Sequence, residues 1–330
     1  MPDDWRIFRG NGKPHDQLSE LPEAPPWRRF GITDVATPGR RLGDHERAAS
    51  YRADERVIDQ VNAALLLRRP LLVTGKPGSG KSTLAYSIAH ELGLEPVLYW
   101  PVTSRTTLEQ GLYSYDAIGR LHETSLRNAT GQADDGPPDI GRYIRLGPLG
   151  TALLPAQRPR LLLIDELDKS DIDLPNDLLH VFEEGCFSIP ELERLPEDQQ
   201  TVEVLTGDGR DRATVVGGRV CCQDFPIVVI TSNGEREFPP AFLRRCIRVV
   251  VEPPSAEQLA DIVEAHLGAD ARAACQPIIE AFTSRRQHAD LATDQLLNAI
   301  FLATSGSRPP EVTLQELTEI LLQPLDRGSA

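Results

Sequence analysis

A glycine-rich octapeptide in the first third of the chain has the composition of a phosphate-binding loop. Residues 75–82 read Gly-Lys-Pro-Gly-Ser-Gly-Lys-Ser, which matches the pattern G-x-x-x-x-G-K-[ST]. Glycines let the backbone curl so that successive N–H groups and the start of the next helix face a β-phosphate. In such a loop Lys81 reaches the β- and γ-phosphate oxygens, and the Ser82 hydroxyl holds Mg²⁺. The expected phosphate-contacting residues are Gly75, Lys76, Pro77, Gly78, Ser79, Gly80, Lys81, Ser82 and Thr83.

Two adjacent carboxylates follow an apolar run later in the chain. Residues 161–164 read Leu-Leu-Leu-Ile and are followed by Asp165 and Glu166. A buried strand that ends in acids places them at the carboxyl edge of a sheet, where open α/β sheets bind ligands. We expect Asp165 to be a metal partner and Glu166 to be the base that polarises an attacking water. The alternative for either residue alone is a solvated acidic loop.

Asn233 and an arginine pair complete the set of residues that could take part in a reaction. The apolar run 227–230 leads into Thr-Ser-Asn233, and an amide at that edge orients water without titrating. Asn233 could instead cap the turn before Gly234. Arg244 and Arg245 follow an apolar stretch. They are either plain surface charge or a finger that reaches the γ-phosphate of a neighbouring subunit.

An α/β core is the architecture that would position these residues. Five short apolar runs of four or five residues alternate with helical stretches, at 71–74, 97–100, 161–164, 227–230 and 247–251. Such unalternated runs are typical of a parallel sheet whose strands are covered on both faces. A helix is predicted over 53–67. After Pro253-Pro254 only helical patterns follow, at 257–267, 275–285, 293–304 and 314–322.

The chain therefore divides into three expected parts. Residues 1–45 are a proline-rich arm, residues 46–252 the α/β core, and residues 253–330 a small helical lid domain.

The five cysteines are odd in number and lack a C-x-x-C pair, so we expect reduced thiols in a cytoplasmic protein. No apolar run approaches the length of a membrane span, and the start of the chain is acidic, which predicts no membrane association.

The charge balance bears on the class of partner. The chain of 330 residues has 35 basic and 49 acidic residues, a formal net charge of −14. A general binder of nucleic-acid backbones would carry clustered Lys and Arg, so the charge balance argues against nucleic acid as a partner. The guanine-reading N-K-x-D pattern is absent from the sequence, which favours adenine as the base.

In order and detail, these elements resemble the MoxR family of AAA+ ATPases. The resemblance covers Ala53 to about Leu325 and rests on three segments: the loop 75–82, residues 161–185 (LLLIDELDKSDIDLPNDLLHVFEEG) and residues 230–246 (ITSNGEREFPPAFLRRC). It implies a P-loop NTPase fold with a five-stranded parallel sheet, flanking helices and a helical lid. It also implies ATP and Mg²⁺ as cofactors, and ATP hydrolysis.

The resemblance further implies an assembly and partners. In that family the ATP site lies between subunits of a ring, usually a hexamer. The positions of this chain that match the site residues of the family are Asp165, Glu166, Asn233 and Arg245, with Arg244 as the alternative for the arginine finger. MoxR-like ATPases often act beside proteins with a von Willebrand A domain. The implied activity is that of a chaperone-like motor that remodels or activates a protein partner.

Two inserts and one departure accompany the resemblance. Residues 103–120 occupy the place of the family's helix-two insertion, and the alternating segments 201–205 and 213–216 predict a hairpin. In relatives such inserts line the pore of the ring, so they are expected to contact substrate. Gln295 stands where the family carries a second-sensor arginine. Either Arg308, Arg285 or Arg286 substitutes, or lid closure is coupled more weakly to the nucleotide.

Three other functions are compatible with the same loop. A DNA-directed AAA+ motor would need a basic pore within an acidic exterior. A small-molecule kinase would need an acceptor pocket, whereas Asn233 and the arginine pair suit water activation and subunit contact. A scaffold that binds ATP without hydrolysis is disfavoured by the presence of both Asp165 and Glu166.

Overall fold

The computed structural model describes residues 51, 53–130, 138–209, 211–267, 272, 276–286, 291, 293–304 and 319–322. The predicted arm 1–45 lies outside the described residues, as do Arg308 and most of the helix predicted over 314–322. Nothing is described of the Arg286 side chain either.

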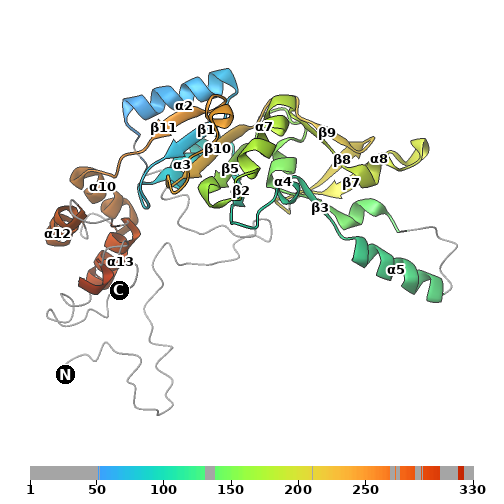
Figure 1. The fold of residues 1–330 in the computed structure, drawn as a ribbon. Helices are drawn as coiled ribbons and strands as arrows, with labels where there is room; N and C mark the ends of the chain where they lie inside the picture. Colours follow the sequence, from blue (N-terminus) through green and yellow to red (C-terminus); the bar gives the residue numbers. More distant parts are fainter. Residues whose placement is uncertain are drawn as a thin grey trace, which may run out of the picture.

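A five-stranded parallel sheet forms the centre of the molecule (Figure 1). The strand order is β11-β1-β10-β5-β2, and every pair of neighbours is parallel. The five predicted strands are confirmed, although β2 begins one residue later than expected. Their bounds are β1 (Leu71–Thr74), β2 (Leu98–Pro101), β5 (Leu161–Asp165), β10 (Ile227–Ser232) and β11 (Ile247–Val250).

Helices cover both faces of this sheet. Helices α2 (Glu55–Leu67) and α3 (Lys81–Leu92) pack on one face, in a cluster that includes Val73, Leu163 and Val229. Because successive strand residues point to opposite faces, Leu72, Ile164 and Ile230 belong to the cluster on the other face. That cluster contains side chains of α6 (Pro148–Ala152), α7 (Leu174–Glu184) and α9 (Pro240–Leu243). The predicted α/β fold is confirmed.

The two edge strands depart from the prediction that all strands are covered on both faces. Tyr99 of β2 is 46 % exposed and Val250 of β11 is 55 % exposed, while their strand neighbours Trp100 and Val249 are buried. At each edge one face of the strand remains open to solvent. Apolar composition alone could not reveal this, because edge and central strands have similar runs of four residues.

A second sheet of six strands, which the sequence analysis did not predict, extends the molecule on the side of β2. Its order is β3-β4-β7-β8-β9-β6. The predicted hairpin is confirmed, since β7 and β8 pair antiparallel from Thr201↔Val216 to Leu205↔Arg212. Most other strands have three residues, too few for a periodic pattern. The bounds are β3 (Tyr113–Tyr115), β4 (Ile144–Leu146), β6 (Cys186–Ser188), β7 (Thr201–Leu205), β8 (Arg212–Val216) and β9 (Arg219–Cys221).

The expectation that all cysteines are reduced thiols is wrong for one pair. Cys186 and Cys221 form a disulfide between β6 and β9, which pair antiparallel with these two residues in register. Their Cα atoms are 4.2 Å apart, the short separation of directly opposed strand residues. The pair is 35 residues apart in sequence, so local spacing could not show it. Cys222 and Cys246 are free, and Cys275 lies outside the described residues.

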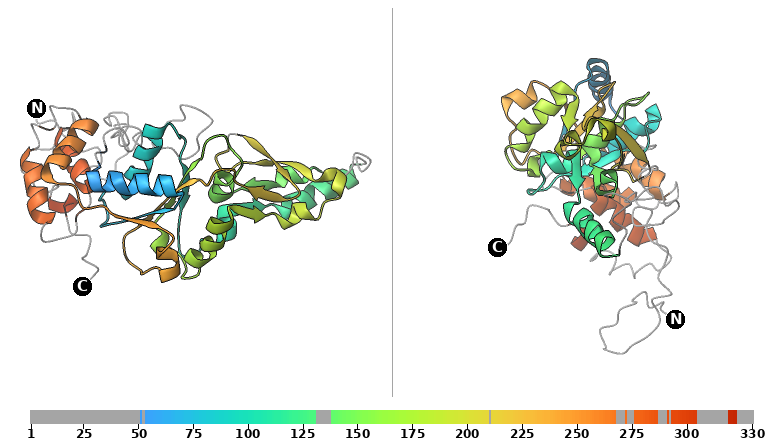
Figure 2. Two further views of the ribbon diagram at one scale, coloured as in Figure 1. Left: turned by 90° about the horizontal axis from the view of Figure 1, so that it is seen from above. Right: turned by 90° about the vertical axis from the view of Figure 1, so that its right-hand side faces the viewer.

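Three helices follow the sheet and build a core of their own. They are α10 (Ala256–Leu267), α12 (Gln276–Arg286) and α13 (Thr293–Thr304), which confirms three of the four helices predicted there. Leu259, Val263, Phe282, Leu296 and Ile300 are buried together. Figure 2 shows these orange and red helices at one end of an elongated molecule and the second sheet at the other.

The remaining helices are short or lie between strands of the second sheet in the sequence. They are α4 (Leu108–Leu112), α5 (Ala117–Ala129) and α8 (Pro190–Glu193), with 3₁₀ turns η4 (Ile140–Tyr143), η5 (Leu167–Lys169) and η6 (Glu197–Gln199). Among the residues that the structure describes, no helix has the length and apolar character needed to cross a membrane.

A truncation in the central strand tests this core. Leu163 of β5 has no exposed surface, so we expect Leu163→Ala to lower the free energy of unfolding by about 2–5 kcal/mol. The matched control is Leu126→Ala on α5, whose side chain is 64 % exposed. Denaturant unfolding of both variants gives the comparison, and equal stability of the two would contradict the assignment of β5 to the core.

Candidate functional site

The glycine-rich loop joins β1 to α3 at the carboxyl ends of the strands. Gly80 is the N-cap of α3 and has a φ of 93°, in the left-handed region that glycine adopts most readily. At Gly75 a Cβ atom would lie only 2.4 Å from the carbonyl oxygen of Val251, so no larger residue fits. The loop therefore forms a tight backbone cradle that ends at a helix N-terminus, as the sequence predicted.

Lys81, in the first turn of α3, is directed back into this loop. Its ammonium group donates hydrogen bonds to the carbonyl oxygens of Gly75 (2.8 Å) and Lys76 (2.9 Å), and the residue is 7 % exposed. Burial lowers the pKa of Lys81, while the nearby carboxylates of Asp168, Asp165 and Glu166 oppose this shift. The structure thus holds a cation at the centre of the predicted phosphate cradle.

The carboxylate of Asp165 connects three strands and the loop. Its Oδ1 accepts hydrogen bonds from the hydroxyls of Ser82 (2.7 Å) and Thr231 (2.6 Å), and its Oδ2 accepts one from Tyr99 (3.2 Å). These residues meet because β5 lies between β10 and β2 in the sheet. Ser82 and Asp165, predicted as a metal pair, are in direct contact.

The donor set fits magnesium. A hydroxyl and a carboxylate at this edge are the oxygen ligands that Mg²⁺ prefers, with the remaining positions filled by substrate phosphates and water. In the described part of the chain, no group of three or more His, Cys, Asp or Glu side chains is arranged to hold a metal ion. A metal here would therefore depend on the substrate for several of its ligands.

Glu166, which follows Asp165, has an unusual backbone conformation. Its φ of 61° and ψ of 47° place a non-glycine residue in the left-handed region, which is uncommon. Its N–H donates to the Thr231 hydroxyl (2.8 Å), which fixes the direction of the turn. The carboxylate pairs with Lys169 (2.8 Å) and lies 3.5 Å from the amide nitrogen of Asn233. The predicted base and the predicted polar amide are thus neighbours.

The arginine pair is not at this edge. Ile247, two residues after Arg245, is in register with Leu71 at the start of β1, whereas the loop follows the end of β1 at Thr74. The four residues of β1 span three rises of about 3.3 Å, so its two ends lie about 10 Å apart. Arg245 pairs with Glu183 near the end of α7, and the carbonyl of Arg244 accepts a hydrogen bond from Arg69 (3.3 Å). The structure does not bring either arginine to the loop of the same chain.

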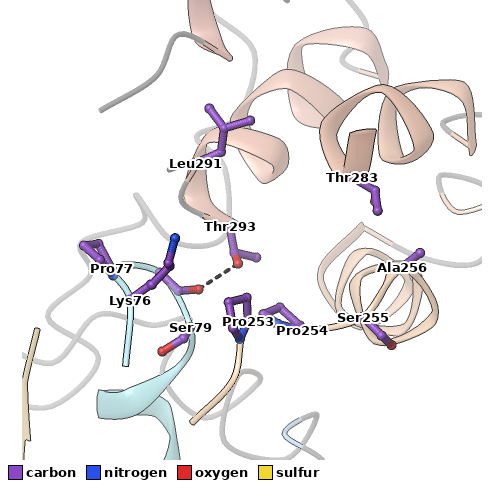
Figure 3. Close-up of a pocket in the computed structure, with 11 residues that line it drawn as sticks. Lys76, Pro77, Ser79, Pro253, Pro254, Ser255, Ala256, Thr283, Leu291 and Thr293 are labelled. Atoms are coloured by element: carbon purple, nitrogen blue, oxygen red, sulfur yellow. Dashed lines mark hydrogen bonds between the residues drawn. The ribbon is translucent and has the colours of Figure 1, made fainter. Parts of the chain in front are cut away.

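A cavity of about 270 Å³ opens beside the loop (Figure 3). One wall is the loop itself, from Lys76 to Ser79, and the opposite wall comes from the start of α10 and from α12 and α13. The Ser79 hydroxyl is buried and has no hydrogen-bond partner among the described residues. The cavity thus adjoins the loop that the sequence predicts to bind phosphates.

The three carboxyl-terminal helices contact the loop through Thr293. Its hydroxyl donates a hydrogen bond to the carbonyl oxygen of Gly78 (2.8 Å), drawn as the dashed line in Figure 3. Gln295, at the position expected for the second-sensor arginine, instead donates to the carbonyl of Leu321 (3.0 Å). Arg285 lies 3.8 Å from Glu319. Arg285, the one alternative whose side chain the structure describes, and Gln295 therefore both have partners in the segment 319–322.

Sequence reasoning missed five side chains of this site, four of which make hydrogen bonds there. Thr231 and Tyr99 bind Asp165, Thr293 binds the loop, and the buried Asp168 accepts hydrogen bonds from the backbone after β10. The only available signal was position: Thr231 and Tyr99 lie near the carboxyl ends of apolar runs. Tyr51 also belongs here, since a Cβ at Gly80 would lie 3.3 Å from its ring, and burial raises its pKa to about 12.

Removing the Thr293 hydroxyl tests whether the contact between loop and helices supports nucleotide binding. We expect Thr293→Val to weaken the affinity for ATP about 2- to 10-fold, the range of one lost hydrogen bond. Thr304→Val is the matched control, because that hydroxyl donates to the carbonyl oxygens of Ile300 and Phe301, within α13. Titration with a fluorescent ATP analogue gives both affinities. Equal affinities would show that the contact has no part in binding.

Comparison with known proteins agrees with this geometry. No curated protein sequence matches the chain significantly. A family model described as an AAA domain of the dynein-related subfamily matches residues 70–246, which is more than half of the chain and contains the loop, both acids, Asn233 and the arginine pair. Membership implies nucleotide binding and, in general, ATP hydrolysis. The cradle, the acidic node at the carboxyl edge and the matched range together show that this chain belongs to the AAA domain family, in its dynein-related subfamily.

Proposed function

We propose that this chain is a MoxR-like ATPase that hydrolyses ATP in a ring of identical subunits and uses the cycle to remodel or activate a protein partner. The observation that carries the proposal is that the Ser82 and Thr231 hydroxyls both donate hydrogen bonds to Asp165. These bonds join the phosphate cradle to the acids at one edge of the sheet. Glu166 and Asn233 lie directly beside this node.

Each residue has a defined part in the proposed reaction. Lys81 and the loop N–H groups bind the phosphates of ATP. Ser82 and Asp165 would hold Mg²⁺, which when bound neutralises charge on the phosphate oxygens. Glu166 orients the attacking water and takes its proton, while the Asn233 amide holds that water without titrating. The adenosine occupies the cavity between the loop and helices α10, α12 and α13.

A substitution of the proposed base separates binding from hydrolysis. Glu166→Gln keeps the size of the side chain and removes the proton acceptor, so we expect ATP affinity to remain and turnover to fall about 10²- to 10⁴-fold. Glu184→Gln is the matched control, because Glu184 is exposed at the end of α7. Phosphate release and nucleotide titration give the two quantities. Steady hydrolysis by the Glu166→Gln protein would contradict the assignment.

The place of the arginine pair supports the proposed ring. Arg244 and Arg245 lie at the amino edge of the sheet, meaning the side of the amino-terminal strand ends, and the loop lies at the opposite, carboxyl edge. An arginine there reaches a γ-phosphate only on another subunit. Repetition of such a head-to-tail contact closes into a ring when the rotation between subunits allows it.

Surface chemistry at the two edges supports this contact. At the amino edge, Leu66 (80 % exposed) and Leu67 (59 % exposed) end α2 and precede the exposed Arg68 and Arg69. Arg69 contacts Arg244, so these residues form one basic and apolar surface. The carboxyl edge offers a complement in the exposed segment Asp171-Ile172-Asp173, with Ile172 61 % exposed. Opposite charges and apolar side chains at opposite edges favour head-to-tail pairing.

A charge placed on the leucine surface tests the assembly. We expect Leu66→Glu to prevent ring formation and to reduce turnover, because the trans arginine is lost, while each monomer still binds ATP. Leu126→Glu is the matched control on α5, where the leucine is 64 % exposed and far from either edge. Native mass spectrometry with ATP and Mg²⁺ gives the subunit number. An intact ring of Leu66→Glu protein would remove this surface from the interface.

The partner in this proposal is a protein client. The MoxR-like segments favour a protein with a von Willebrand A domain or another protein client. The second sheet and α5 extend away from the nucleotide cavity and provide surface for such a client (Figure 2). The net charge of −14 also favours a protein client over a nucleic acid.

A further inference from the structure

Asp168 is a buried carboxylate that none of the proposed chemical steps uses. It lies in η5, two residues after Glu166, and is 4 % exposed. Aspartate is seldom buried to this extent unless its carboxylate is paired or hydrogen-bonded, because removing a charge from water is costly. Its surroundings should therefore show what holds it.

The carboxylate binds the backbone of the turn that follows β10. One oxygen, Oδ2, accepts hydrogen bonds from the N–H groups of Asn233 (2.9 Å) and Glu235 (3.1 Å). Gly234 between them has a φ of 78°, a conformation that lets both N–H groups point to one acceptor. A second contact joins the same two segments, since Arg236 donates to the carbonyl of Ser170 (2.7 Å).

This turn determines the direction of the Asn233 side chain. The amide nitrogen lies 3.5 Å from the Glu166 carboxylate and 3.4 Å from that of Glu235, so the side chain alone has two nearly equal partners. Side-chain contacts of this length are weak and fix no orientation. The shorter hydrogen bonds from the backbone N–H groups to Asp168 therefore fix the backbone position from which the Asn233 side chain extends.

The charge of Asp168 also acts on the lysine of the phosphate cradle. Its Oδ1 is buried and lacks a hydrogen-bond partner among the described residues. Of the three carboxylates that favour the charged form of Lys81, Asp168 has the largest effect. One side chain thus interacts with the turn that carries Asn233 and with the lysine of the loop.

We propose that Asp168 is a positioning residue, which holds the turn at Asn233–Glu235 so that the Asn233 amide stays beside Glu166. The residue touches neither nucleotide nor water in this account. Its effect on turnover rests on the proposed function, but its effect on the turn does not. Truncation should free two buried N–H groups and let the turn relax.

Three variants of the full-length chain test this role. Asp168→Ala removes the acceptor. Asp168→Asn retains a carbonyl oxygen that can accept both N–H bonds, and it places the amide NH₂ where Oδ1 has no partner. Asp177→Ala is the matched control, because Asp177 is an exposed aspartate in the first turn of α7. The measurements are turnover, ATP affinity, and hydrogen exchange of the peptide that contains residues 233–235.

We expect Asp168→Ala to lower kcat at least about tenfold with ATP affinity within about threefold of the parent protein, the pattern of a loss confined to the transition state. Exchange at 233–235 should be faster in this variant, because its amides lose their acceptor. Asp168→Asn and Asp177→Ala should match the parent protein in turnover to within about threefold, and in exchange.

Several results would overturn the role. One is an Asp168→Ala protein that matches Asp177→Ala in turnover and exchange; another is an Asp168→Asn protein as impaired as Asp168→Ala, which would assign the effect to charge. A parallel fall of affinity and kcat would show general damage to the site. If Asp168→Ala fails to fold, the Asp168→Asn result decides. If the parent protein hydrolyses no ATP, the proposed function fails, while the exchange comparison still tests the hold on the turn.

Discussion

The site depends on one hydrogen-bonded carboxylate, that of Asp165. It receives the hydroxyls of Ser82 from the loop, Thr231 from β10 and Tyr99 from β2, so three strands and the start of α3 share one acceptor. Thr231 also accepts the N–H of Glu166 and thereby directs the left-handed turn that carries the proposed base. Because bonds to a charged acceptor are strong and directional, a shift of any of these segments would displace the others.

A second constraint comes from the parallel sheet itself. All five strands run in one direction, so every loop that follows a strand lies at one edge and every segment that precedes a strand lies at the other. Asp165 ends β5, and Glu166 and Asn233 follow strands, whereas Arg244 and Arg245 precede β11. These two acids and the two arginines therefore lie at opposite edges of the sheet within one chain. This separation gives the molecule two chemically different edges, which suit contact between copies.

Much of the first sheet could be predicted from sequence, and the reasons are physical. The central strands are buried on both faces and stand out as apolar runs, and the loop 75–82 needs glycine at close backbone contacts such as that of Gly75 with Val251. The second sheet was missed except for its hairpin, because strands of three residues have no periodicity. The disulfide between Cys186 and Cys221 depends on pairing across 35 residues. Asp168 and Thr293 were missed because their partners are backbone groups, which no residue type reveals.

A triphosphate bound in the loop 75–82 should meet, at its terminal group, acids from the same chain and an arginine from another copy. A high-resolution structure of the assembled protein with a non-hydrolysable ATP analogue and Mg²⁺ tests it most directly. We expect the β-phosphate against Lys81 and the loop N–H groups, with the γ-phosphate near Glu166 and near Arg244 or Arg245 of a second subunit. An empty loop, or a γ-phosphate contacted only by its own chain, would contradict it.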